Sequence, residues 1–276
     1  MTQDREWEFD YDEADFEAIR KRIRQAAGIQ LGDSKRQMVY SRIVRRLRSL
    51  NLNSFQQYLF YLDDHPNEIE LFINALTTNL TSFFREPHHF KALNQILLER
   101  YQGGGRALRI WCAAASTGEE PYSIAMTACQ TFESLTPPVQ ILATDIDSQV
   151  LRTAQMGVYP ESRIKDLDPT LKRAYLLRGK GDKSGMVRMR PELGRLIRFQ
   201  RLNLLDRQWD VKPGLDVIFC RNVMIYFDKS TQMSLLDRMV PLLSDDGYYI
   251  AGHSETIDRN FRALRLVGKT LYQRQA

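Results

Sequence analysis

The sequence contains little that would suit a secreted, membrane-spanning or disulfide-linked protein. Its 276 residues include three cysteines, which are far apart and form no CxxC pair or metal-ligand spacing, so we expect reduced thiols. No apolar run approaches the ~20 residues of a membrane span. The N-terminal stretch is acidic, whereas a secretory signal begins with basic residues and continues with apolar ones. These absences predict a cytoplasmic protein that does not insert into a membrane.

The composition is that of an ordinary globular protein, with 43% hydrophobic and 26% charged residues and a net charge of +5. The charges are unevenly distributed along the chain. Residues 1–19 contain eight acids and one arginine, whereas residues 20–48 contain ten basic residues and one acid. The local excess of positive charge predicts either a solvated helix face or a surface that docks an anionic partner.

Two different sequence patterns divide the chain near residue 77. Up to that point apolar residues recur at helical spacing, which predicts an all-helical N-terminal domain over residues 1–77. Over residues 78–276 short apolar runs alternate with helical stretches, which predicts an α/β domain with a largely parallel sheet and an antiparallel finish. Residues 160–200 interrupt this alternation, and we expect a small antiparallel insertion with a glycine-rich hairpin there.

The stretch LRIWCAAASTGEEPYS (108–123) predicts a ligand-binding turn between a buried strand and a helix. Small residues over 113–118 let a ligand approach the backbone, and parallel sheets bind ligands at the carboxyl ends of their strands. Asp145 ends the next strand, where an acid typically accepts hydrogen bonds from ribose hydroxyls. The alternative is that the small residues only allow close packing of helix on strand.

The nature of the ligand follows from what surrounds this turn. The G-x-G-x-x-G dinucleotide fingerprint and the G-x-x-x-x-G-K-[ST] phosphate loop are both absent. Glu119 and Glu120 would repel a pyrophosphate, but they would attract the sulfonium and amino groups of S-adenosylmethionine. The pattern therefore predicts S-adenosylmethionine as the cofactor.

A further strand, LDVIFC (215–220), is followed by Arg221, Asn222 and Tyr226. The Asn/Asp-Pro-Pro-aromatic segment common in adenine methyltransferases is absent here, and a cation, an amide and a phenol suit a carboxylate acceptor. A glutamate is ionised at pH 7, so it needs desolvation and orientation and no general base. The alternative for Asn222 is a structural cap of the strand.

Residues 77–90, TTNLTSFFREPHHF, place Asn79, Thr81 and Arg85 at the junction of the two predicted domains. Interdomain junctions are preferred ligand sites. The alternative is turn chemistry and a surface pair between Arg85 and its neighbour Glu86. His88 and His89 are adjacent, so on a helix they face different directions, and we expect no metal site.

Six motifs of the chain resemble a known family when they are taken in order: TTNLTSFFRE, AAASTGEEPYSIAM, ATDID, NLLD, FCRNVMIYFD and GHSE. They resemble the bacterial chemotaxis-receptor glutamate methyltransferases, the CheR family, over nearly the whole chain. Ordered motifs are far more specific than any one of them. The resemblance implies a Rossmann-like methyltransferase sheet, glutamyl methyl esters formed on the cytoplasmic helices of chemoreceptors, and S-adenosylhomocysteine as the second product.

The resemblance also implies roles for individual residues. The reacting centre would be lined by Arg85, Arg221 and Tyr226. Glu120 would bind the cofactor in preference to Glu119. The full set of implied cofactor contacts is Asn79, Thr81, Arg85, Glu120, Asp145, Asn203, Leu204, Arg221 and Asn222.

Two surfaces would contact the receptor. The acidic methylation helix would dock on Arg42, Arg45 and Arg46. The insertion resembles the subdomain that, in some members, binds a receptor's C-terminal pentapeptide by strand addition, and it contains Gly179, Gly181 and Gly185. The arginines have two alternatives, a solvated face and a nucleic-acid patch, but the first 84 residues show no nucleic-acid-binding pattern. The alternative functions are an RNA or DNA methyltransferase and a non-catalytic partner-binding module.

Overall fold

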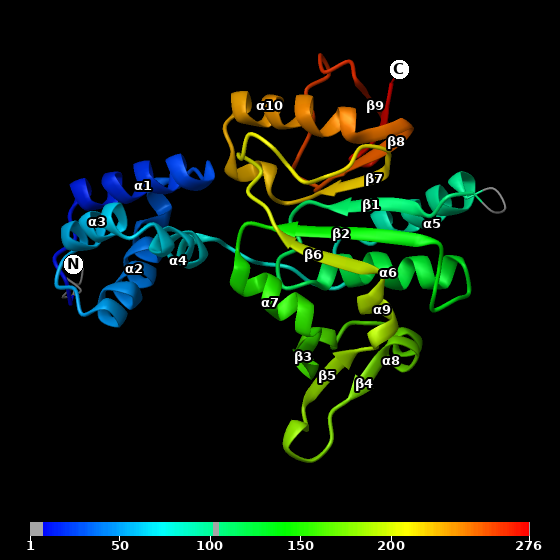
Figure 1. Cartoon of the computed structure of the whole chain (residues 1–276), viewed down its shortest axis with the longest axis horizontal. Helices are drawn as coiled ribbons and strands as arrows, with labels where there is room; N and C mark the ends of the chain where they lie inside the picture. The colour runs from blue at the N-terminus through cyan, green and yellow to red at the C-terminus, as the bar shows by residue number, and fades with distance from the viewer. Residues whose placement is uncertain (1–7, 102–104, 276) are drawn as a thin grey trace, which may run out of the picture. The chain divides into compact units, whose positions relative to one another are not determined.

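The chain folds into two compact units in a computed structural model, which describes residues 8–101 and 105–275 (Figure 1). Unit 1 contains the described residues up to Thr78 together with Tyr226–Thr231. Unit 2 contains Asn79–Ile225 and the described residues from Gln232 onward. Asp4, Arg5 and Glu6 of the acidic N-terminal stretch lie outside the described residues.

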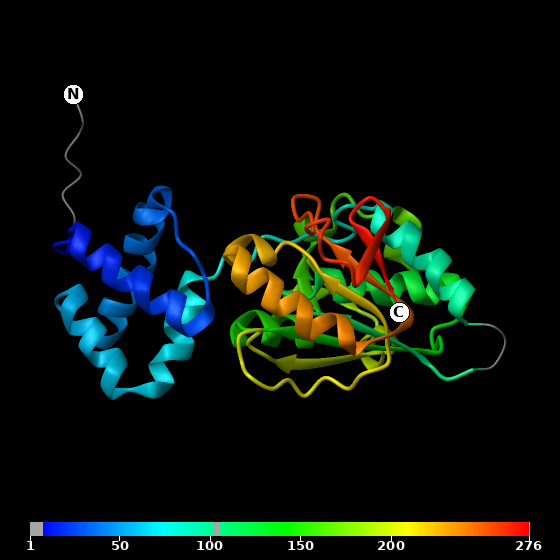
Figure 2. The same ribbon diagram turned by 90° about the horizontal axis from the view of Figure 1, so that it is seen from above.

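Unit 1 is helical, as the apolar spacing predicts. Local signals set the helix ends: Asp12 forms a capping box with Asp15, Gly28 ends the first helix at φ 69°, and Ser54 caps the third. Figures 1 and 2 show these helices in blue to cyan. They are α1 (Glu13–Ala27), α2 (Arg36–Leu50), α3 (Phe55–Asp64) and α4 (Pro66–Leu76), with the short 3-10 helix η1 (Asp33–Lys35) before α2.

One apolar stripe from each helix fills the core of unit 1. Helices α1 and α2 both pack on α4, and the side chains between them recur three or four positions apart. The fully or almost fully buried members are Phe16, Ile19, Ile23, Ile43, Leu47, Tyr58, Leu62, Phe72 and Ile73.

Unit 2 is built on a seven-stranded sheet with the order β6-β2-β1-β7-β8-β10-β9. Its first five strands in that order run parallel, and β10 pairs antiparallel with both β8 and β9. The strands are β1 (Leu108–Cys112), β2 (Val139–Asp145), β6 (Ile197–Arg201), β7 (Leu215–Cys220), β8 (Leu243–Ala251), β9 (Leu264–Gly268) and β10 (Leu271–Arg274). The α/β fold class with an antiparallel finish is confirmed.

Helices connect and cover these strands. Helices α5 and α6 pack on each other, and α6 contacts β2 and β6, while α7 also contacts those two strands. The helices are α5 (His88–Arg100), α6 (Glu119–Thr131), α7 (Ser148–Met156) and α10 (Lys229–Met239), with the 3-10 turns η4 (Met224–Tyr226) and η5 (Val240–Leu242) on either side of α10. Strand β1 is an interior strand, paired with β2 on one side and β7 on the other, so the turn that follows it starts between two neighbouring strands.

A small three-stranded antiparallel sheet, β3-β5-β4, projects from the large sheet (Figure 1). Its strands are β3 (Val158–Pro160), β4 (Leu176–Arg178) and β5 (Met186–Met189), with η2 (Glu161–Ile164), α8 (Pro169–Tyr175), η3 (Gly181–Lys183) and α9 (Pro191–Arg195) around them. The C-terminal part of the range expected for the insertion differs, because β6 belongs to the large sheet and runs parallel to β2. In the large sheet, a turn at Thr270 joins β9 to β10.

The three thiols are unpaired and buried: Cys112 ends β1, Cys220 ends β7 and Cys129 lies on α6. Burial raises the pKa of each of them. Among the residues that the structure describes, no helix has the length and apolar character needed to cross a bilayer.

Candidate functional site

The turn between β1 and α6 is fastened to the strands on both sides. The backbone N–H of Ala113 donates to the carbonyl of Phe219 on β7, and that of Ala115 donates to the carbonyl of Thr144 on β2, each at 2.8 Å. Gly118 closes the turn with φ +100°, and a Cβ there would lie 2.7 Å from the Tyr159 hydroxyl oxygen. Only glycine fits this position, and the turn brings the start of α6 to the carboxyl edge of the sheet.

Asp145 connects the end of β2 to this turn. Its carboxylate accepts hydrogen bonds from the backbone N–H of Ser116 at 2.8 Å and of Asp147 at 3.0 Å. Burial raises the pKa of Asp145 to about 6, because it outweighs these hydrogen bonds, which lower the pKa. A carboxylate has about four acceptor positions, so two accepted bonds leave capacity for the hydroxyls of a ribose.

A buried charge group made of Glu86, Glu120 and Arg221 lies at the same edge. Arg221 is 3% exposed; its Nη1 pairs with Glu120 Oε2, and its Nη2 lies 3.2 Å from Glu86 Oε2. Burial opposes ionisation of both partners, but their mutual attraction outweighs it, so the pKa of Glu86 is lowered and that of Arg221 is raised. Two carboxylates and one guanidinium leave a net charge of −1, which suits a cationic ligand.

The segment after Thr78 lies against both features. The Asn79 side chain donates to Asp147 Oδ2 at 2.9 Å, and the Asn79 carbonyl faces the Ser116 hydroxyl at 3.4 Å. The carbonyl of Arg85 accepts a hydrogen bond from Arg221 Nη2 at 2.5 Å. The structure therefore brings the ends of this segment to the turn after β1 and to the buried charge group.

Thr81 in this segment and Glu119 at the start of α6 both contact Arg163. The carbonyl of Thr81 accepts from Arg163 Nη1 at 3.3 Å. That same nitrogen lies 3.4 Å from Oε1 of Glu119, which is completely buried. Arg163 belongs to η2, so the small sheet region reaches the candidate site through this guanidinium and through the Tyr159 hydroxyl of β3, which donates to the Thr117 carbonyl at 2.8 Å.

The NLLD segment follows β6 beside the end of β2. The backbone N–H of Leu202 donates to the carbonyl of Asp145 at 2.9 Å. Asn203 Oδ1 accepts from the N–H of Leu205 at 3.0 Å, and Leu204 is buried, with its carbonyl accepting from Arg238 at 3.1 Å. Asn203 and Leu204 are thus held near Asp145 along the same sheet edge.

Tyr226 is grouped with unit 1, whereas Arg221 and Asn222 belong to unit 2. Its hydroxyl donates to the Thr78 carbonyl at 3.4 Å, and its own carbonyl accepts from the N–H of Gln30 at 2.9 Å. Both of these contacts are made within unit 1.

The three arginines predicted to dock a partner differ in their contacts. Arg46 makes a two-bond ion pair with Glu68 of α4, with both distances 2.8 Å, and Arg42 donates to the carbonyls of Ala75 and Thr77. The side chain of Arg45 is exposed. Arg42 and Arg46 therefore connect α2 to α4 and to the residue that follows it, and docking of a partner by the three arginines stays a prediction.

The three glycines of the insertion shape the connection between β4 and β5. The N–H of Gly179 donates to the Met186 carbonyl at 2.9 Å, and Gly181 and Gly185 have φ +58° and +80°. Strands β3 and β4 are the edges of the small sheet, and Leu177 on β4 is 43% exposed.

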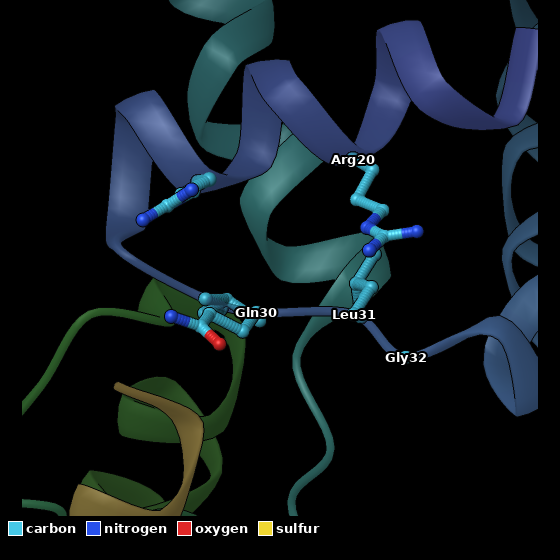
Figure 3. A pocket seen from close by; sticks show the side chains of 6 residues that line it. Arg20, Gln30, Leu31 and Gly32 are labelled. Carbon is cyan, nitrogen blue, oxygen red and sulfur yellow. The ribbon is translucent and has the colours of Figure 1, made fainter. Parts of the chain in front are cut away.

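Unit 1 contains a recess of about 170 Å³ between α1 and the chain over 29–32 (Figure 3). Both arginines at this recess have carboxylate partners: Arg20 pairs with Glu17 and Asp33, and Arg24 pairs with Asp228. These ion pairs compensate the charges of both arginines.

The described residues include two neighbouring histidines, His88 and His89, at the start of α5. Burial lowers the pKa of His89 to about 4, and its Nε2 lies 2.9 Å from the Thr270 hydroxyl. Within residues 8–101 and 105–275, no three His, Cys, Asp or Glu side chains gather in a way that could hold a metal ion.

Two carboxylates of the site, Glu86 and Glu255, are absent from the predicted site residues. Glu86 belongs to the motif TTNLTSFFRE and Glu255 to GHSE, and both contact the loop after β7. Their only sequence signal was membership of those motifs, because an acid in a loop shows no periodicity.

Both parts of the chain are similar to known protein families. Residues 14–77 match the family described as "CheR methyltransferase, all-alpha domain", and residues 79–272 match "CheR methyltransferase, SAM binding domain". The chain is 51% identical to Chemotaxis protein methyltransferase 2 of Pseudomonas aeruginosa, over 96% of this chain and 94% of that protein. It is 48% identical to the chemotaxis protein methyltransferases of Salmonella typhimurium and Escherichia coli, over 94% of this chain and 90% of each.

Proposed function

The chain belongs to the CheR methyltransferase family, and from this membership we propose that it esterifies glutamate side chains of chemoreceptors on their cytoplasmic helices. It is an S-adenosylmethionine-dependent methyltransferase of chemotaxis. The observation that carries the proposal is the buried charge group of Glu86, Glu120 and Arg221 beside Asp145, because its net charge of −1 suits a sulfonium donor at the carboxyl edge of the sheet.

Each residue set would hold one part of the donor. Asp145 would accept from the ribose hydroxyls, Asn203 and Leu204 would contact the adenine, and Glu120 would attract the positive charge of the methionine end. Asn79, Thr81, Arg85 and the loop that starts with Arg221 and Asn222 would close the site around it. These roles rest on the hydrogen bonds that bring the segments together.

The reaction needs little acid or base chemistry from the protein. Bound S-adenosylmethionine supplies a methyl group on a positively charged sulfur. The acceptor glutamate has an ordinary pKa near 4.3, so it is ionised at pH 7 and no proton must be removed. The protein then contributes by excluding water and by holding the carboxylate oxygen in line with the methyl group. Arg85 and Tyr226 would line the acceptor side.

Receptor contacts are proposed for two surfaces. The exposed Arg45 on α2 would attract the acidic methylation helix, mainly as steering and register. The small β3-β5-β4 sheet would add a receptor's C-terminal pentapeptide as a further strand at one of its edges.

Titration calorimetry with S-adenosylmethionine and S-adenosylhomocysteine tests the donor site first. We expect one site per chain, loss of binding in Asp145→Ala, and unchanged binding in Asp237→Ala, an exposed acid on α10. Transfer of labelled methyl to receptor fragments then tests the acceptor. A glutamyl ester releases methanol in mild alkali, whereas an N-methyl group is stable, so alkali-stable label would contradict the proposed acceptor.

A further inference from the structure

One buried carboxylate, Glu255, holds the loops that follow β7 and β8. Glu255 is 7% exposed. Its Oε2 accepts from the backbone N–H of Asn222 and of Gly252, both at 2.7 Å, and its Oε1 accepts from the N–H of Ile225 at 3.4 Å. Two loops that lie 30 residues apart in the chain therefore share one acceptor group.

The loop after β7 turns sharply at Asn222. This residue has φ +56°, in the left-handed region that asparagine adopts more readily than most residues with a side chain. The partner loop approaches so closely that a Cβ on Gly252 would lie 2.6 Å from Asn222 Nδ2 and 2.6 Å from Glu255 Oε2. Glycine at 252 and glutamate at 255 thus act together on the conformation of Asn222.

A second carboxylate contacts the same loops from the other side. Glu86 accepts from the N–H of His253 at 3.0 Å, lies 3.2 Å from Arg221 Nη2, and lies 3.5 Å from Asn222 Nδ2. Asn222 is therefore held at its backbone by Glu255 and faces Glu86 with its side-chain amide.

We infer that Glu255 is a positioning residue, which fixes Asn222 and Arg221 at the carboxyl end of β7 in the geometry that methyl transfer requires. The inference rests on the proposed function, which assigns Arg221 and Asn222 to the donor site. Glu255 touches neither substrate nor donor in this account. It acts through backbone N–H groups, and its removal leaves buried donors unpaired.

A graded pair of variants tests this inference. Glu255→Gln retains one acceptor oxygen, and Glu255→Leu removes both. With a receptor fragment as acceptor, we expect kcat to fall about tenfold in the first and by more than about a hundredfold in the second, with KM for the fragment unchanged. Gly252→Ala should reproduce the loss by pushing Asn222 away. Glu99→Gln, an exposed acid on α5, is the matched control.

Melting temperature and affinity for S-adenosylhomocysteine distinguish the outcomes. A merely structural Glu255 would lower the melting temperature of Glu255→Gln and leave its kcat and affinity at wild-type values well below melting, and that result would overturn the inference. If the wild type does not methylate glutamate but Glu255→Gln still weakens S-adenosylhomocysteine binding, the proposed acceptor fails and the positioning role stands.

Discussion

Asp145 combines two roles that respond to pH in opposite directions. Its pKa is raised to about 6 by burial, from 3.8. The folded protein therefore binds this proton more tightly than the unfolded chain does. The contribution of Asp145 to the free energy of unfolding is largest below pH 4 and is lost as the pH rises through about 4 to 6. Ligand binding should depend on the opposite form, because ribose hydroxyls need an ionised acceptor.

We expect the affinity for S-adenosylhomocysteine to weaken about tenfold between pH 8 and pH 5, since a carboxyl group of pKa about 6 is about one-tenth ionised at pH 5. Calorimetry across this range measures the change. Asp145→Asn, which cannot ionise, should bind weakly at every pH and show no such slope. An equal slope in both proteins would assign the titration to another group.

Local rules made part of the site predictable at the scale of single residues. Asp145 was expected because an acid at the end of the second strand of such a sheet has one common use. Glu86 and Glu255 were missed because their partners, Arg221 and Asn222, come from other loops. Nothing in a loop sequence indicates which backbone N–H groups a carboxylate will meet after folding.

At the scale of elements, helix α2 shows what the spacing of residues can and cannot predict. The spacing of its arginines correctly placed them off the buried stripe of Val39, Ile43 and Leu47. It could not show that α4 would pack beside them and supply Glu68 as a partner for Arg46. Neighbouring positions on a helix can therefore have unrelated roles.

Charge reversal should separate those roles. Arg45→Glu is expected to raise the KM for a receptor fragment severalfold, more at low than at high salt, without changing S-adenosylhomocysteine affinity. Arg46→Glu should instead lower the free energy of unfolding by about 3 kcal/mol, because Glu68, which also accepts from the Tyr58 hydroxyl, loses its cationic partner and faces a like charge. Steady-state kinetics and urea unfolding measure the two effects. Equal KM values in the wild type and Arg45→Glu would remove α2 as the docking element.

Strand prediction succeeded where strands are buried on both faces and failed at the margins. Residues 108–112 and 215–220 were expected and are β1 and β7. Strand β6 is an edge strand with one exposed face, so IRFQR alternates like an antiparallel strand and was assigned to the insertion. The turn between β9 and β10 is hard to predict because Thr270 takes φ +47°, which a β-branched residue rarely does.

At the scale of the whole molecule, family membership answers the choice between a chemotaxis enzyme and a nucleic-acid methyltransferase. The division near residue 77 follows a change of pattern that the sequence displays. The assignment of Tyr226–Thr231 to unit 1 does not, because it depends on contacts such as that of Arg24 with Asp228. Sequence patterns predict the secondary structure of a segment better than they predict which segments it will contact.

Two proposed receptor surfaces on one chain predict an effect of tethering. A receptor whose tail binds the small sheet is held at a high effective concentration near the enzyme. Free pentapeptide should therefore raise the KM for a tailed receptor and leave kcat unchanged. A receptor fragment that lacks the tail is the control, and its KM should not respond. Methylation rates at fixed donor concentration measure both. No effect on the tailed receptor would place this enzyme among peptide-independent members.

Chemical labelling of the buried cysteines can report when the large sheet opens. Cys112 and Cys220 end two adjacent central strands, β1 and β7, and burial raises the pKa of both. Only an exposed thiolate can attack a disulfide reagent such as Ellman's and displace its thiolate leaving group, so modification in native buffer should require the strands to separate. The rate of thiol labelling at increasing urea concentrations would then measure how fast the sheet opens locally at the edge where we expect the donor to bind.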